Sequence, residues 1–228
     1  MGLGLDQVDK KKTYDSIDQM VQTEKLRILG GFHPKEEDNL RPEIKTMLLL
    51  GPDEPKFWKG IIASPEWLSK EKNPIDLWSY RIINAIAKDL KASAFFPFGT
   101  PLNPFYEWAL RSKSAWVSPV SLLVHAEVGL MVSYRGALGL KEKIKLPALK
   151  LRPCAKCSKP CLTSCNVSAL TERGYDVPKC LSYLKSKEGK TNLSIGCSVR
   201  LSCPVSQKFI RDPGQTAYHM SIFSNSGN

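Results

Sequence analysis

The sequence predicts an α+β protein in which a layered α/β domain with a mixed sheet is followed by a small cysteine-rich module. Three observations lead to this prediction. The chain has 228 residues, of which 42% are hydrophobic, so it can bury one main core and a small second one. Strand and helix patterns alternate before residue 118. All seven cysteines follow residue 153.

The first part of the chain supplies the elements of the layered domain. The apolar run in TMLLLGP, residues 46–52, predicts a buried strand that ends in a Gly-Pro turn. Apolar side chains recur at helical spacing over residues 74–90, which predicts an amphipathic helix. A strand that begins at Phe95 and a short helix over 107–112 follow. We expect residues 1–25 to form a loosely held amphipathic helix or arm.

A β-hairpin is the last element that we expect in this domain. Residues 118–138 contain two apolar stretches around a turn near 126–129, and their pairing would complete the sheet. The segment KEKIKLPALKLRP, residues 141–153, is basic and contains two prolines, as is typical of a domain boundary. We therefore divide the chain into an N-terminal arm (1–25), an α/β domain (26–146) and a cysteine-bearing domain (147–228).

The positive charge of the chain lies with the cysteines. Residues 1–140 hold 18 Lys and Arg against 17 Asp and Glu, whereas residues 141–228 hold 15 against 5, which accounts for +10 of the net charge of +11. Such a basic surface would attract an acidic redox partner or RNA. The chain opens without a signal-peptide pattern and has no apolar stretch long enough to span a bilayer, so we expect a cytoplasmic protein.

Four cysteines form a crowded run. CAKCSKPCLTSC, residues 154–165, has the spacing C-x2-C-x3-C-x3-C, which iron–sulfur clusters use together with a distant Cys-Pro, here Cys203-Pro204. In ferredoxins with two clusters, the fourth cysteine of such a run ligates the other cluster. One [4Fe-4S] cluster would then be held by Cys154, Cys157, Cys161 and Cys203. The metal ligands of a second cluster would be Cys165, Cys180 and Cys197, which is one thiolate short.

Other interpretations of these residues stay open. A structural zinc site with four cysteines usually shows two separated C-x2-C pairs, and disulfides do not suit an odd number of cysteines in a cytoplasmic chain. His219 is a candidate fourth ligand of the second cluster, with packing against a helix as the alternative. His33 and His125 would face a cofactor pocket or be hydrogen-bonded structural histidines. Tyr134 and Arg135 would reach an anionic ligand or lie at the surface.

The cysteine region resembles a known group of proteins. PCAKCSKPCLTSCNVSAL, GYDVPKCLSYL and GCSVRLSCPV followed by YHM are similar to the cysteine region of uncharacterised bacterial ferredoxin-like proteins, which resemble the cluster domain of epoxyqueuosine reductases. The resemblance covers roughly residues 118–220. It implies a mainly helical ferredoxin-like module with [4Fe-4S] clusters beside an α/β domain that holds a corrinoid or flavin. It also implies an oxidoreductase that serves electron transport.

The chain departs from that family at two places. The reductases have eight cluster cysteines, whereas GCSVRLSCP, residues 196–204, lacks the middle cysteine of their closing C-x2-C-x3-C-P. Asn166 stands where a proline is usual. The resemblance thus implies transfer of electrons from the clusters to an acceptor held by the N-terminal domain, with no substrate indicated. The alternative is a non-enzymatic module, stabilised by metal, whose basic face binds RNA or a protein partner.

Overall fold

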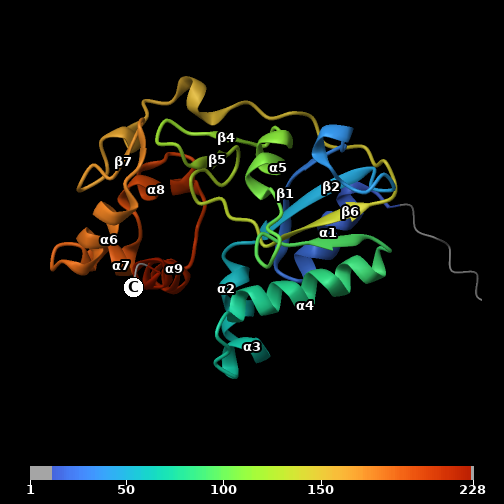
Figure 1. Cartoon of the computed structure of the whole chain (residues 1–228), viewed down its shortest axis with the longest axis horizontal. Coiled ribbons are helices and arrows are strands. Elements are labelled where there is room, and N and C mark those ends of the chain that lie inside the picture. Colours follow the sequence, from blue (N-terminus) through green and yellow to red (C-terminus); the bar gives the residue numbers. More distant parts are fainter. Residues whose placement is uncertain (1–11, 227–228) are drawn as a thin grey trace, which may run out of the picture.

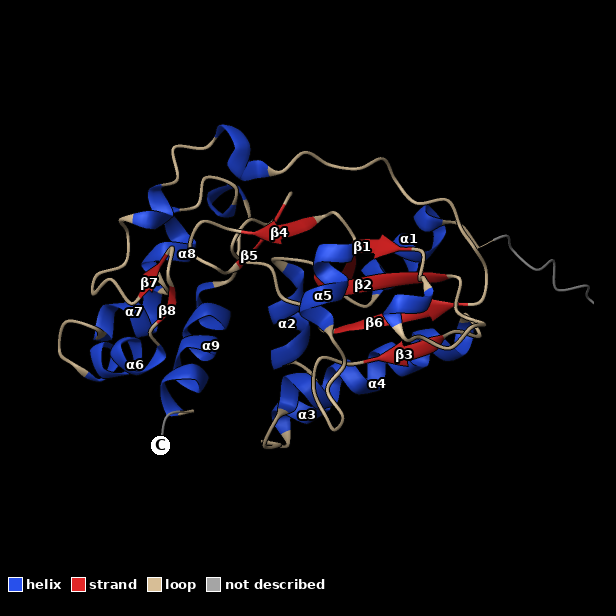
Figure 2. Cartoon of the chain, turned by 45° about the horizontal axis from the view of Figure 1, so that its top comes forward, coloured by secondary structure: helices blue, strands red, loops and turns tan. Residues whose placement is uncertain are grey.

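A computed structural model of the chain describes residues 12–226, and Figures 1 and 2 show how its elements are arranged. The helices are α1 (Tyr14–Thr23), α2 (Lys56–Ile62), α3 (Pro65–Leu68), α4 (Pro74–Asp89), α5 (Phe105–Arg111), α6 (Val177–Lys185), α7 (Lys190–Ile195), α8 (Ser198–Ser202) and α9 (Pro213–Asn225). The 3-10 turns are η1 (Glu36–Asp38), η2 (Pro153–Lys156), η3 (Pro160–Leu162) and η4 (Ser206–Lys208). The strands are β1 (Leu26–Phe32), β2 (Thr46–Pro52), β3 (Ser93–Phe95), β4 (Ala115–Val117), β5 (Leu123–His125), β6 (Gly136–Leu140), β7 (Leu170–Thr171) and β8 (Gly174–Tyr175).

The main sheet has the strand order β1-β2-β6-β3, and every neighbouring pair is antiparallel. The α+β class is therefore confirmed, but the expectation of a mixed sheet was wrong. β2 and β3 run in the same direction and are joined through α2, α3 and α4, as in a βαβ unit. They are not neighbours because β6, which comes later in the chain, lies between them.

Helices and loops cover both faces of this sheet, which explains the continuous apolar run of β2. Leu48 and Leu50 pack with the side chains of α1, α2 and α4 on one face. Met47 and Leu49 pack with those of α5 on the other face. Because successive side chains of a strand point to opposite faces, a central strand with both faces covered needs apolar residues at every position. The predicted strand over 46–52 is confirmed on this basis.

On the first face of the sheet, one helix agrees with the prediction and the other does not. The amphipathic helix expected over 74–90 is confirmed as α4, which buries Ile75, Trp78, Ile83 and Ile86. Residues 14–23 are not loosely held, because they form α1 and bury Ile17 and Val21 against the sheet. Residues 1–11 of the expected arm lie outside the described residues.

The hairpin expected over 118–138 was wrong. β5 pairs with β4, which the sequence analysis did not predict, and β6 pairs with β2 and β3 in the centre of the main sheet. All five residues of β6 are buried, so this strand needed a covered neighbour on each side rather than one hairpin partner. The turn after β5 is present, and the backbones of His125 and Gly129 bridge across it.

The cysteine-bearing part is mainly helical and lies at one end of the molecule, with the main sheet at the other (Figure 1). Residues 143–152 connect the two as an extended segment without helix or strand. An apolar core joins the β4–β5 region to the module, and it includes Val120, Val124, Leu130 and Val199. Trp58, Trp67 and Tyr218 form a second contact, between α2, α3 and α9. No helix in the described part of the chain has the length and apolar character needed to cross a membrane.

Candidate metal centre and adjoining cavity

Four thiols gather where the cysteine run meets the end of α8. Cys154 lies in η2, Cys161 lies in η3, and Cys203 follows the last residue of α8. Burial raises the pKa of Cys161, and the thiols of Cys154, Cys203 and Cys157 raise it further. Burial likewise raises the pKa of Cys154, as do Cys157 and Cys203. We call these four residues the first cysteine set; a bound metal would reverse the shifts by favouring thiolates.

The backbone around the first cysteine set is shaped for close approach. Lys159 has a left-handed conformation with φ of 57°, and its N–H donates to the Cys157 Sγ at 3.3 Å. Gly129, in the turn after β5, has φ of +59°, and a Cβ at this position would lie 3.1 Å from the Cys203 Sγ and 2.5 Å from the Ser206 nitrogen. Glycine therefore lets this turn pack directly against the Cys203 thiol and Ser206.

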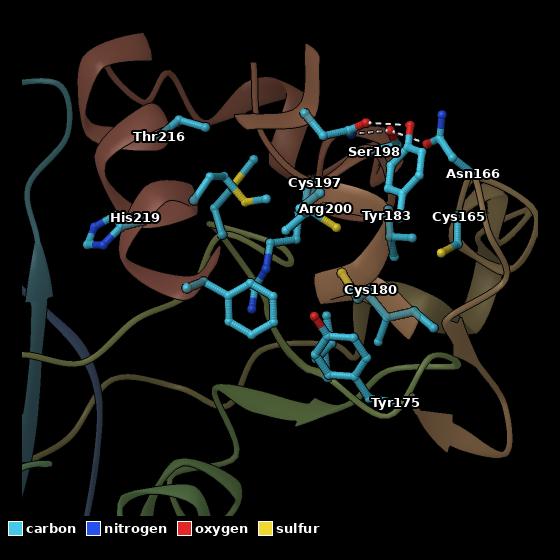
Figure 3. A pocket seen from close by; sticks show the side chains of 18 of the residues that line it. Cys165, Asn166, Tyr175, Cys180, Tyr183, Cys197, Ser198, Arg200, Thr216 and His219 are labelled. Carbon is cyan, nitrogen blue, oxygen red and sulfur yellow. Dashed lines mark hydrogen bonds between the residues drawn. The ribbon is translucent and has the colours of Figure 1, made fainter. Parts of the chain in front are cut away.

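The other three cysteines line a cavity of about 300 Å³. Cys165 lies in the loop after η3, Cys180 lies on α6, and Cys197 immediately precedes α8. Burial raises the pKa of Cys180, a hydrogen bond with the Tyr175 hydroxyl lowers it, and the thiols of Cys197 and Cys165 raise it. The three thiols are therefore neighbours, and Figure 3 shows them at one end of the cavity. We call them the second cysteine set.

A chain of hydrogen bonds holds the segments that carry the second cysteine set. The Tyr183 hydroxyl of α6 donates to the Asn192 Oδ1 of α7 at 3.0 Å. The Asn192 Nδ2 donates to the Ser198 Oγ at 2.9 Å and to the Gly196 oxygen at 2.9 Å. The Ser198 Oγ donates to the Asn166 Oδ1 at 2.8 Å. Asn166, the residue found where a proline is usual, thus ties the loop after Cys165 to the start of α8.

Three arginines line the cavity; Arg200 lies beside Cys197 (Figure 3), whereas Arg135 and Arg211 lie toward His219. Arg135 precedes β6, Arg200 lies on α8, and Arg211 precedes α9. Burial lowers the pKa of Arg211 to about 10, against the opposing effect of Glu54, and both other arginines lower it further. The Arg211 Nη2 donates to the Met131 oxygen at 2.7 Å, and the Arg200 guanidinium donates to the Leu130 oxygen. We call these residues the arginine end.

His219 belongs to the arginine end and not to the second cysteine set. It projects from α9, and Figure 3 shows it across the cavity from Cys165 and Cys180. Burial lowers its pKa to about 3, and Arg211, Arg135 and Arg200 add to this shift. The imidazole is therefore neutral near pH 7. Its position does not bring it to the three thiols, so it does not complete their number to four.

Glu54 is a buried acid that the sequence analysis missed. Its side chain has no exposed surface, and its Oε1 lies 3.7 Å from the Arg211 Nε. Burial raises its pKa to about 7, although Arg211 lowers it. Gln215 adjoins the carboxylate, yet the polar atoms of both side chains lack hydrogen-bond partners of normal geometry. The sequence position of Glu54, just beyond the end of β2, could have indicated a functional residue, because functional side chains often follow strand ends.

Of the other residues singled out from the sequence, three have structural roles and one lines the cavity. The His33 Nε2 lies 2.9 Å from the Ile144 oxygen, and the His125 Nε2 lies 3.0 Å from the Leu29 oxygen. Both are hydrogen-bonded structural histidines. The Tyr134 side chain is buried beside Phe105 and does not reach the cavity. Arg135 does line the cavity, and only 18% of its side chain is exposed, so it is not a surface residue.

Among the described residues, no three His, Cys, Asp or Glu side chains converge on a point that would suit a single metal ion. A structural zinc ion binds all its ligands at 2.0 to 2.3 Å, roughly, and needs such convergence. A [4Fe-4S] cluster differs because each thiolate binds a different iron atom, so its cysteines stand around a larger group.

Comparison with known proteins identifies no family for this chain. No family model matches the chain, and no curated protein matches it. Among solved structures, a crystal structure of selenomethionine-labelled epoxyqueuosine reductase aligns with a TM-score of 0.42 at 17% sequence identity. The alignment covers 90% of this chain and 64% of that one. The chain spans less than two thirds of that protein, and a likeness of this degree supports no activity by itself.

Proposed function

We propose that the chain is an iron–sulfur redox protein whose two cysteine sets hold [4Fe-4S] clusters. One observation carries the proposal: cysteines that are distant in sequence gather into two separate groups. Cys203 adjoins Cys154 and Cys161, and Cys180 adjoins Cys197 and Cys165. Four cysteines are the usual ligands of such a cluster, which the first cysteine set provides. The second cysteine set provides three, which would leave one iron without a cysteine ligand.

Donors around the thiols also fit this role. Backbone N–H groups of Lys159 and Ala169 donate to the Sγ atoms of Cys157 and Cys165, at 3.3 and 3.1 Å. Hydrogen bonds to cluster sulfurs and nearby positive charge both favour the reduced, more negative state of a cluster. The excess of 15 basic over 5 acidic residues in the segment 141–228 acts in the same direction.

The short helix between the two sets supports a role in electron transfer between the clusters that they would hold. α8 begins directly after Cys197 of the second set and ends directly before Cys203 of the first. At a rise of about 1.5 Å per residue, the six steps from one to the other span about 9 Å of backbone. When bound, the clusters would supply one-electron transfer. The protein side chains position them, exclude water and set their potential.

Replacement of one cysteine from each set tests the assignment. We expect Cys203→Ser and Cys180→Ser each to lose about four iron atoms and four sulfides per chain after anaerobic purification. Ser182→Ala is the matched control, because Ser182 is an exposed residue on the same helix as Cys180. Its iron content should equal that of the wild type. Zinc without sulfide, or unchanged iron in both cysteine variants, would contradict the proposal.

The acceptor is proposed to be an organic cofactor at the N-terminal domain, a corrinoid or a flavin. Support for it comes from the resemblance of the cysteine region rather than from a cavity in the domain. A cavity beside β1, lined by residues such as Tyr14 and His125, has a volume of about 70 Å³. Ligand sites usually have volumes of roughly 300 to 1,000 Å³. Titration of the reduced protein with hydroxocobalamin and with FMN, followed by absorbance, tests both. Failure of both to bind would remove this part of the proposal.

A second candidate function follows from the charge alone. The net charge of +10 over residues 141–228 favours a module that binds RNA or an acidic protein, with metal serving stability. Under this alternative, a fluorescent RNA would bind with an affinity that falls steeply as salt rises. Cys203→Ser would then unfold the module, and reduction of the wild-type protein would leave RNA affinity unchanged. Absence of RNA binding at low salt would exclude the RNA form of this alternative.

A further inference from the structure

The arginine end of the cavity holds more positive charge than the residues around it offset. Asp76 lies 3.5 Å from Arg135, with 38% of its side chain exposed to solvent. Glu54 lies 3.7 Å from Arg211, and burial raises its pKa to about 7, so its charge is incomplete near neutral pH. Arg200 has no carboxylate partner in the described part of the chain.

The thiol that faces Arg200 does not remove this excess. The charge of Cys197 favours the charged form of Arg200, but only as a thiolate does Cys197 carry that charge. If Cys197 ligates a cluster, its charge is shared with the iron, and Arg135 and Arg211 still face the far end of the cavity. Neutral His219 adds no charge of either sign there. Burying an unmatched guanidinium is costly, which favours an anion in this place.

Apolar side chains form much of the cavity wall. Met131 and Val132 come from the segment before β6, and Met220 and Phe223 come from α9. The volume of about 300 Å³ includes the space beside the second cysteine set, so a ligand that shares the cavity with a cluster must be small. The cavity therefore pairs a cationic end with an apolar body, and this shape suits a ligand with one charged group and a compact hydrocarbon part.

We propose that this cavity is a binding site for a small organic anion, in which a carboxylate or phosphate group meets Arg135, Arg200 and Arg211 and an apolar body lies against Met131, Met220 and Phe223. Guanidinium groups match both anions through paired N–H donors. The body of the ligand would extend toward the second cysteine set. The site consists of protein groups alone, so the inference does not rest on the presence of iron.

Calorimetric titration of the full chain, purified anaerobically, tests the site with three probes of similar shape. Phenyl phosphate and benzoate carry the two anionic groups, and benzyl alcohol carries none. We expect saturable binding of at least one of the anions, and at least tenfold weaker binding of benzyl alcohol. The iron content of each sample is measured in parallel. Binding of the anion to a wild-type sample that holds no iron would support the site even if the redox proposal failed.

Variants at the arginine end complete the test. Arg211→Gln and Arg135→Gln should each weaken anion binding at least tenfold, whereas Arg173→Gln, at an exposed position outside the cavity, should leave it unchanged. Thr216→Trp keeps the arginines and fills the cavity, so it should abolish binding even if an arginine variant folds poorly. Equal affinity in all four variants, or no binding of either anion to the wild type, would overturn the proposal.

Discussion

Gly129→Ala should destabilise the protein by about 3 kcal/mol through two separate effects. Gly129 has φ of +59°, and an alanine in this conformation costs about 1 kcal/mol. The new Cβ would lie 2.5 Å from the Ser206 nitrogen and 2.6 Å from its Oγ, so the turn and η4 must move apart. That movement breaks the buried 2.8 Å hydrogen bond from the Leu130 N–H to the Ser206 Oγ, which costs about 2 kcal/mol more.

Gly99→Ala separates the two effects. Gly99 also has a positive φ, of +91°, but a Cβ at this position meets no atom within 4 Å. This control should therefore lose only the conformational part, about 1 kcal/mol. Urea unfolding followed by far-UV circular dichroism gives both values, and iron content should fall in Gly129→Ala because the Cβ would also lie 3.1 Å from the Cys203 Sγ. Equal destabilisation by the two substitutions would refute the close approach at Gly129.

Three further predictions concern the site and the contact that frames it. Burial raises the pKa of Glu54 to about 7 in the folded protein. The unfolded chain releases the Glu54 proton at a lower pH, so this residue lowers the free energy of unfolding as pH rises from 5 to 8. Wild type should lose about 2 kcal/mol relative to Glu54→Gln over that range in urea unfolding, and a pH-independent difference would contradict the burial. Tyr175→Phe removes the hydrogen bond to Cys180, so the midpoint potential of the second cluster should fall while the iron content stays constant. An EPR-monitored redox titration measures this potential, and an unchanged value would mean that the Tyr175 hydroxyl does not act on the cluster. Trp58→Ala opens the aromatic contact between α2 and α9 and should lower the free energy of unfolding by about 3 to 5 kcal/mol, whereas a loss below about 1 kcal/mol would mean that this contact does not bind the two parts together.

The sequence predicted those elements whose pattern is local. The apolar run of β2 and the helical spacing of α4 each report burial along one segment, and both elements are where we expected them. The partner of β6 could not be inferred in this way, because an apolar strand pairs equally well with a sequence neighbour or with a distant strand. β6 joined β2 and β3, and the short β4 became the partner of β5.

The candidate site shows the same division. The spacing of the cysteines predicts two sets of cluster ligands, and that assignment stays a prediction; in the structure Cys161 lies near Cys203, and Cys180 lies near Cys197. Arg211 and Glu54 carry no such spacing, and they meet where α9 packs against α2. Charged residues that are brought together by long-range packing have no characteristic spacing in the sequence. The sequence left two roles open for His219, because its place relative to the thiols depends on the position of α9.

The most direct measurement of the central claim is the iron and acid-labile sulfide content of the wild-type chain after anaerobic purification, with EPR of the reduced sample. Two clusters predict about eight iron atoms per chain, or about seven if the second cluster lacks the iron without a cysteine ligand. About four would leave Cys165, Cys180 and Cys197 as thiols beside the cavity. Zinc in place of iron, with no sulfide and no EPR signal, would contradict the account of this protein as an iron–sulfur redox protein.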